Sequence, residues 1–300
     1  MGIVARKSGG GVQLELELER GDLIPGRLVP GVLRLLPGSP REIRGAFVTL
    51  VGTEHWKHEV TDRDANGTTR TRIVREEREL PRVPVELLGS TALGGAERRD
   101  LPFEIPVPGL GPPSVAADVC GVTWTLEAKL DVPGFDPGIA MPVTIHQPTA
   151  LLRAGVVPLD QFALWPSADA TADGLQSSIS LDPVPLDLGG PFTGRLSLET
   201  DGRYEVQEVR LELRVHAEAT VSSGLREEIT IWSAAVLGAG RLPPGRQEFE
   251  FAGELPETAL PTATLPHGRT NARMHVIVAR AWARDPHLVR DVALATTTEV

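Results

Sequence analysis

Two histidines, His55 and His58, are close together in the sequence, and imidazole is a common ligand of zinc. They fall in a stretch that alternates as a β-strand does, and residues three apart on a strand point to opposite faces. One zinc ion could not then reach both rings. We therefore expect a partly exposed polar strand edge here and no metal site.

The segment from Asp62 to Gly67 matches the first half of a calcium-binding EF-hand loop, D-x-D-x-N-G. The twelfth position of such a loop needs an acidic residue that supplies two oxygen ligands, and Ile73 stands there. A β-hairpin with Asn66-Gly67 as its tight turn explains the same residues. We expect the hairpin, and no cofactor or metal anywhere in the protein.

Cys120 is the single cysteine of the chain. No histidine and acidic residue accompany it in a recognisable nucleophile pattern. The sequence also contains no phosphate-binding loop, nucleophile elbow or dinucleotide fingerprint. We therefore expect Cys120 to be a small buried residue at the start of a strand, and we expect a protein that is not an enzyme.

The second arm of the expected hairpin is rich in arginine. Four of its side chains are candidates for binding a partner: Arg70, Arg72, Arg75 and Arg78. Guanidinium groups pair in a bidentate manner with carboxylate and phosphate, which suits an acidic or phosphorylated partner. Glu76, Glu77 and Glu79 alternate with them, however, and a mixed-charge strand is also a common protection against aggregation at a sheet edge. Both interpretations stay open.

The elements that position these residues show a period of two. Val122, Trp124 and Leu126 alternate with polar residues, which predicts a strand with one apolar and one hydrated face. Leu14 and Leu16 alternate with glutamates in the same way, and helical periodicity is nearly absent. Glycine and proline, at 31 and 26 residues, separate the alternating runs as turn residues do. The pattern predicts an all-β protein with these residues in its core: Leu16, Phe103, Trp124, Leu126 and Phe251.

The chain repeats one plan. Gly26 and Gly189 are 163 positions apart, as are Gly31 and Gly194, while Phe103 and Phe251 are 148 positions apart. Apolar and turn positions agree between the two halves and charged positions do not, as expected of two copies of one fold. We predict two consecutive immunoglobulin-like β-sandwiches. The expected boundaries are a flexible terminus over residues 1–11, a first sandwich over 12–150, a linker over 151–174 and a second sandwich over 175–300.

The order and spacing of these motifs resemble the arrestin family. The stretches FEIPVP and CGVTWTLEAKL resemble the N-terminal arrestin domain, and EFEFAGELPETALP with MHVIVARAWA resembles the C-terminal one. The resemblance implies two arrestin-type sandwiches that act as a scaffold, as in arrestin-like or sporulation-control proteins. The chain has no PPxY motif, and His146 stands where receptor-binding arrestins carry a phosphate-sensing arginine. The resemblance therefore does not extend to ubiquitin-ligase docking or receptor-type phosphate sensing.

Composition narrows the range of partners. The net charge of −10 argues against nucleic acid and against direct binding to an anionic membrane. No run approaches the ~18–20 apolar residues that span a bilayer, no signal peptide is visible, and a single cysteine suits a reducing cytosol. We expect a cytoplasmic adaptor that binds a protein partner, through which any membrane contact would be made. The alternative is a regulator or carrier that binds a small ligand between the two sandwiches.

Overall fold

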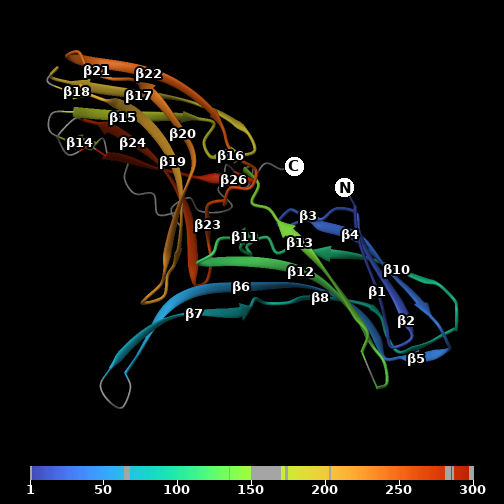
Figure 1. Cartoon of the computed structure of the whole chain (residues 1–300). Helices are drawn as coiled ribbons and strands as arrows, with labels where there is room; N and C mark the ends of the chain where they lie inside the picture. Colours follow the sequence, from blue (N-terminus) through green and yellow to red (C-terminus); the bar gives the residue numbers. More distant parts are fainter. Residues whose placement is uncertain are drawn as a thin grey trace. The chain divides into compact units, whose positions relative to one another are not determined.

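The computed structural model describes residues 2–63, 68–134, 136–149, 170–172, 175–202, 204–280, 285 and 287–296, and every element with bounds in this part of the chain is a β-strand (Figure 1). The predicted all-β class is confirmed. The predicted hairpin turn at Asn66-Gly67 and most of the predicted linker over 151–174 lie outside the described residues.

The first sheet of the N-terminal half is antiparallel and follows the order β1 (Ile3–Gly9), β2 (Val12–Leu18), β4 (Leu28–Pro37) and β10 (Arg99–Pro106). β1 pairs with β2 along its whole length, which corrects the prediction of a flexible terminus over residues 1–11. Gly10 and Gly11 have φ angles of 57° and 72°, the left-handed pair that a type I′ hairpin turn requires. The polar, glycine-rich composition that suggested disorder therefore belongs to a tight hairpin.

The second sheet of this half has its strands in the order β3 (Asp22–Leu23), β13 (Gly138–Ile145), β12 (Cys120–Asp131), β6 (Gly45–Arg63) and β7 (Thr69–Glu79). β8 (Val83–Leu88) also pairs with β6, and β11 (Val115–Ala116) pairs with β12. A separate ribbon joins β5 (Arg41–Ile43) to β9 (Thr91–Leu93). The apolar face predicted for the segment 122–130 is buried along β12, including Trp124 and Leu126.

The C-terminal half repeats this arrangement. One sheet has the order β14 (Ala170–Ala172), β15 (Leu175–Asp182), β17 (Pro191–Thr200) and β22 (Gly245–Glu254). The other has the order β20 (Arg226–Leu237), β19 (Glu208–Ala219), β24 (Gly268–Ala279) and β23 (Ala263–Thr264), with β25 (His287–Val292) also paired to β24. Short ribbons join β16 (Leu186–Leu188) to β26 (Leu294–Thr296) and β18 (Glu205–Val206) to β21 (Gly240–Arg241). Side chains from both main sheets share one hydrophobic core, as in a sandwich.

The spacing found in the sequence recurs in the strand bounds. β4 and β17 begin and end 163 positions apart, and β12 and β24 begin and end 148 positions apart. Gly26 and Gly189 have φ angles of 77° and 75°, so both hold the left-handed conformation that favours glycine. Gly31 pairs with Phe103 and Gly194 with Phe251 in equivalent positions of the two antiparallel sheets.

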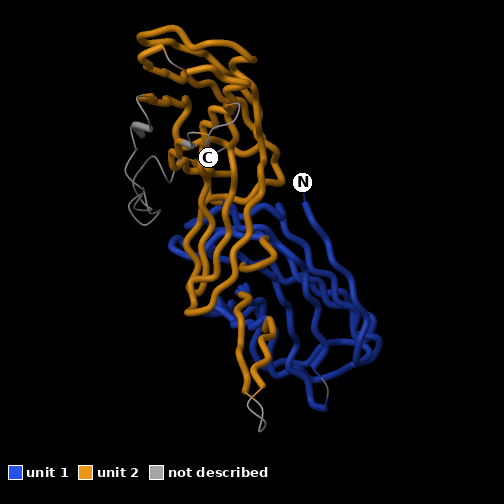
Figure 2. The backbone as a smooth tube through the Cα atoms, turned by 60° about the vertical axis from the view of Figure 1, so that its left-hand side comes forward, with its two compact units in different colours: residues 1–55, 75–116, 121–146 blue, residues 56–74, 117–120, 147–300 orange. Residues whose placement is uncertain are grey.

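The chain divides into two compact units, coloured in Figure 2. Unit 1 comprises residues 1–55, 75–116 and 121–146, and unit 2 comprises 56–74, 117–120 and 147–300. The segments 56–74 and 117–120, which the sequence placed in the first domain, therefore belong to unit 2. The compact units differ in this respect from the two consecutive domains that we predicted.

Candidate functional site

β7 is the best candidate for a binding surface. It is the last strand of its sheet, after β6, so one row of its backbone N–H and C=O groups has no neighbouring strand within the described residues. Ten of its eleven residues are exposed, and Val74 is half-buried. Ile73 is 61% exposed and is one of several large apolar residues on the surface of the described chain.

The four arginines predicted as partner-binding residues all lie on β7 and are all exposed. Because side chains alternate along a strand, Arg70, Arg72 and Arg78 share one face and Arg75 lies on the other. The structure therefore does not gather the four into one cluster. Arg72 Nε donates to Asp62 at 3.2 Å and Arg75 Nε donates to Glu77 at 3.1 Å. These are exposed ion pairs, and such pairs contribute only about 0–1 kcal/mol each.

The outer part of β6, which supports β7, is fixed within unit 2 by backbone hydrogen bonds. Glu59 N donates to Ser223 O at 3.0 Å, and Ser223 Oγ donates back to Glu59 O at 2.7 Å. Lys57 N donates to Val119 O at 2.8 Å, and the Lys57 ammonium lies 2.6 Å from Asp118 Oδ1. The part of β6 that carries β7 is therefore held in place by hydrogen bonds at Lys57 and Glu59.

The pair His55 and His58, which we considered as metal ligands, has other surroundings. His55 is buried, with 8% of its surface exposed, so the prediction of a partly exposed edge is wrong for this residue. The neighbouring Trp56 stacks on His267 with a centroid distance of 4.0 Å and an interplanar angle of 17°. No sequence pattern links Trp56 to a histidine in the other half of the chain, so sequence reasoning missed this contact.

Neither metal motif gains ligands in the described part of the chain, where no group of three or more His, Cys, Asp or Glu side chains could hold an ion. Asp62 lies beside Arg72. The remainder of the calcium-like loop, residues 64–67, is outside the described residues.

Cys120 is buried at the start of β12, as predicted. Its thiol lies 3.5 Å from Glu218 O and 3.9 Å from Arg269 O, both in unit 2. A side chain added at Gly268 would meet the Cys120 sulfur at 2.8 Å. Small residues at both positions therefore allow the close approach of these strand starts.

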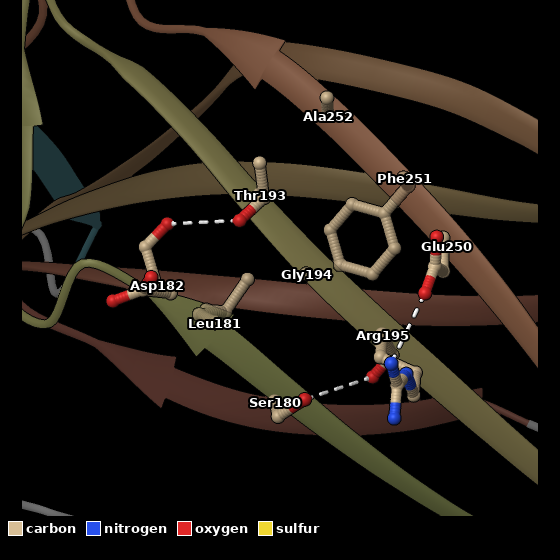
Figure 3. A pocket seen from close by; sticks show the side chains of 9 residues that line it. All are labelled: Ser180, Leu181, Asp182, Thr193, Gly194, Arg195, Glu250, Phe251 and Ala252. Carbon is tan, nitrogen blue, oxygen red and sulfur yellow. Dashed lines mark hydrogen bonds and ion pairs between the residues drawn. The ribbon is translucent and has the colours of Figure 1, made fainter.

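Two shallow depressions, of 630 Å³ and 640 Å³, lie at equivalent positions of the two four-stranded sheets. The first surrounds Gly31 and Phe103, and the second, shown in Figure 3, surrounds Gly194 and Phe251. In the second, the Thr193 hydroxyl donates to Asp182 O at 3.5 Å. In each half a phenylalanine ring lies against the glycine: a Cβ would meet the Phe103 ring at 2.4 Å from Gly31 and the Phe251 ring at 2.3 Å from Gly194.

The hydrated face of β19 and β24 carries a charged network. Burial raises the pKa of Glu212, but hydrogen bonds from Arg214 and Arg210 outweigh it, so the pKa lies below its usual value. Burial lowers the pKa of His216, and the negative charges of Glu228 and Asp291 oppose this effect without reversing it. The network therefore favours an ionised Glu212 and a neutral His216.

A scan of protein-family models found no match to this chain, and neither did a search of the curated proteins. The resemblance to arrestin domains thus stays a prediction from the sequence motifs. Among the described residues, no helix has the length and apolar character needed to cross a bilayer.

Proposed function

We propose that the protein is a non-enzymatic scaffold that binds protein partners along the free edge of β7. The supporting observation is an eleven-residue strand, exposed almost throughout, at the end of a sheet. An extended peptide can add to such an edge through main-chain hydrogen bonds, and side chains at alternate positions then determine which peptide is preferred. In this proposal the chain serves as a cytoplasmic adaptor of arrestin-like architecture.

The arginines of β7 would make this edge prefer acidic peptides to basic ones. Arg70, Arg72 and Arg75 are concentrated in the first part of β7, within a protein of net charge −10. Acidic groups on an added strand would lie opposite these guanidinium groups and pair with them. The proposed partner is therefore an extended acidic segment of another protein. The alternative of a small-ligand carrier stays a prediction.

The test uses two labelled ten-residue peptides: one has glutamates at both odd and even positions, so that both faces of the added strand are acidic, with valine elsewhere, and the other has lysine in place of each glutamate. Fluorescence anisotropy at low salt should show binding of the acidic peptide and much weaker binding of the basic one. The triple variant Arg70→Glu, Arg72→Glu and Arg75→Glu should lose most of the affinity for the acidic peptide. The parent's own affinity should fall as salt rises, because exposed charges are screened.

A matched control changes the net charge equally at exposed arginines elsewhere: Arg20→Glu, Arg27→Glu and Arg246→Glu. This control should bind the acidic peptide nearly as well as the parent does. Equal loss of affinity in both triple variants would mean that net charge, and not the position of the arginines, controls binding. Unchanged affinity in the β7 variant would reject the proposed site. Circular dichroism of each variant would verify that the β-sheet content is intact.

A further inference from the structure

The charges of β7 are distributed unevenly along the strand. Arg70, Arg72 and Arg75 occupy its first part, and Glu76, Glu77 and Glu79 follow, with Arg78 among them. A strand with a positive start and a mainly negative end is complementary to a second copy of itself that runs in the opposite direction. The free edge of β7 could therefore pair with the same edge of another molecule.

Symmetry restricts how two such edges can meet. Two identical antiparallel strands are related by a two-fold axis perpendicular to the sheet, and that axis passes between one residue and its own copy. Residues equally far from the axis, on opposite sides of it, then lie opposite each other. Each possible register is therefore defined by the single residue on the axis.

Like charges exclude most of these registers. If the axis passed at Arg72, Arg75, Glu76 or Glu77, that side chain would lie opposite the same side chain of the second copy, and the two like charges would repel each other. An axis at Thr71 would place Arg70 opposite Arg72. An axis at Val74 would place Arg70 opposite Arg78.

The register with Ile73 on the axis is free of these conflicts. Arg70 then lies opposite Glu76 of the second copy, and the reciprocal pair forms on the other side of the axis. Thr69 to Glu77 would overlap, and no like charges would face each other within that overlap. The exposed Ile73 side chain would contact its own copy and lose contact with water.

We propose that two copies of the protein pair antiparallel through their β7 edges, with Ile73 of each copy on the two-fold axis. This inference rests on the proposed function of β7 as a docking edge, and it names a second copy of the chain as one occupant. The pairing surface is one strand wide, so association should be weak and depend on concentration.

Cysteine substitution tests the register directly. Ile73→Cys should form a disulfide-linked dimer under mild oxidation by dissolved oxygen, because the two thiols would lie opposite each other across the axis. Arg72→Cys and Val74→Cys should each link poorly alone but should link to one another when mixed, since these two positions face each other. The parent is the control, because its only thiol, Cys120, is buried.

Charge exchange tests the pairing without a covalent link. In sedimentation velocity, Arg70→Glu alone and Glu76→Arg alone should each reduce dimerisation at least tenfold, because each places like charges opposite one another. A mixture of the two variants should restore a dimer that contains one copy of each. Arg20→Glu, an exposed change outside β7, should dimerise as the parent does.

Three results would overturn the inference: a parent that stays monomeric up to about 1 mM, linking at Arg72→Cys that matches Ile73→Cys, or no recovery in the charge-exchange mixture. The acidic peptide separates this failure from that of the proposed function. A monomeric parent that still binds the peptide through its arginines loses only the inference. A parent that neither dimerises nor binds the peptide loses both.

Discussion

At the residue scale, Trp124 shows how one side chain connects a strand to the loop that covers it. Its ring is buried, with 3% of its surface exposed, and its Nε1 donates to Pro112 O at 3.2 Å. The tryptophan thus fills the core and satisfies its single polar group at the same time. Substitution would remove both contributions.

We expect Trp124→Ala to lower the free energy of unfolding by about 3–5 kcal/mol, because it removes a large buried side chain and leaves a cavity. Urea denaturation followed by circular dichroism measures the change. Leu110→Ala, at a position 87% exposed and outside β7, should have little effect in the same assay. A Trp124→Ala variant as stable as the parent would contradict the burial of this ring.

Gly31 illustrates the opposite requirement, since its position needs the absence of a side chain. A Cβ there would lie 2.4 Å from the Phe103 ring and 2.7 Å from Glu17 O. Gly31→Ala should therefore destabilise the protein by about 1–3 kcal/mol through overpacking. Gly238→Ala is the matched control, because nothing lies within 4 Å of a Cβ at that position. Thermal denaturation compares the two, and equal melting temperatures would count against the tight contact.

At the element scale, the sheet that contains β19 and β24 should respond to pH through His216. Burial lowers the pKa of this imidazole from the ordinary value of 6.5, so the folded state binds its proton less readily than the unfolded state does. The contribution to stability is therefore complete above pH 6.5 and is lost as the pH falls below it. Glu228 and Asp291 oppose this loss, while Arg273 and Arg214 add to it.

We expect the parent to lose stability between about pH 7.5 and 5.5, and His216→Gln to lose less over the same interval. Urea midpoints at a series of pH values measure the difference between the two proteins. Identical pH profiles would show that His216 does not titrate differently in the folded and unfolded states.

The sequence predicted elements of this kind well wherever one face is buried and the other hydrated. In the segment 122–130, the alternation identified a strand and the face it buries, because burial itself creates the period of two. The short strand β1 was not predicted, because its polar and glycine-rich residues show little alternation between apolar and polar positions. Its pairing depends on the Gly10-Gly11 turn, whose meaning is visible only together with β2. The arginine strand was foreseen, with a sheet edge as one of its two open interpretations, but the neighbour it pairs with depends on the order of all the strands.

At the scale of the whole molecule, unit 2 is assembled from three separate stretches of chain. Trp56 and His267 stack although they are distant in the sequence, and Lys57 contacts the segment 117–120. Periodicity describes neighbours along a strand, so it could not reveal which strands from the two halves would come together. This is why the repeat was predictable and the composition of the compact units was not.

The stacked pair can be tested with a double-mutant cycle. Trp56→Ala and His267→Ala should each destabilise the protein, and the double variant should lose less than the sum of the two. The coupling free energy should be about 0.5–1.5 kcal/mol, as for other ring pairs. Denaturant midpoints of the four proteins provide it, and strictly additive effects would mean that the rings do not interact in solution.

The three-part composition of unit 2 has a consequence for the order of synthesis. Trp56 is made well before its packing partner His267, which follows roughly 200 residues later. At about 5–20 residues per second, a ribosome needs about 10–40 s to make the chain between them. Throughout that delay Trp56 must wait without His267, although the segment 117–120, which Lys57 contacts, is made sooner. The dense mixture of arginine and glutamate on β7 would keep the nascent arm hydrated and discourage its pairing with other nascent chains.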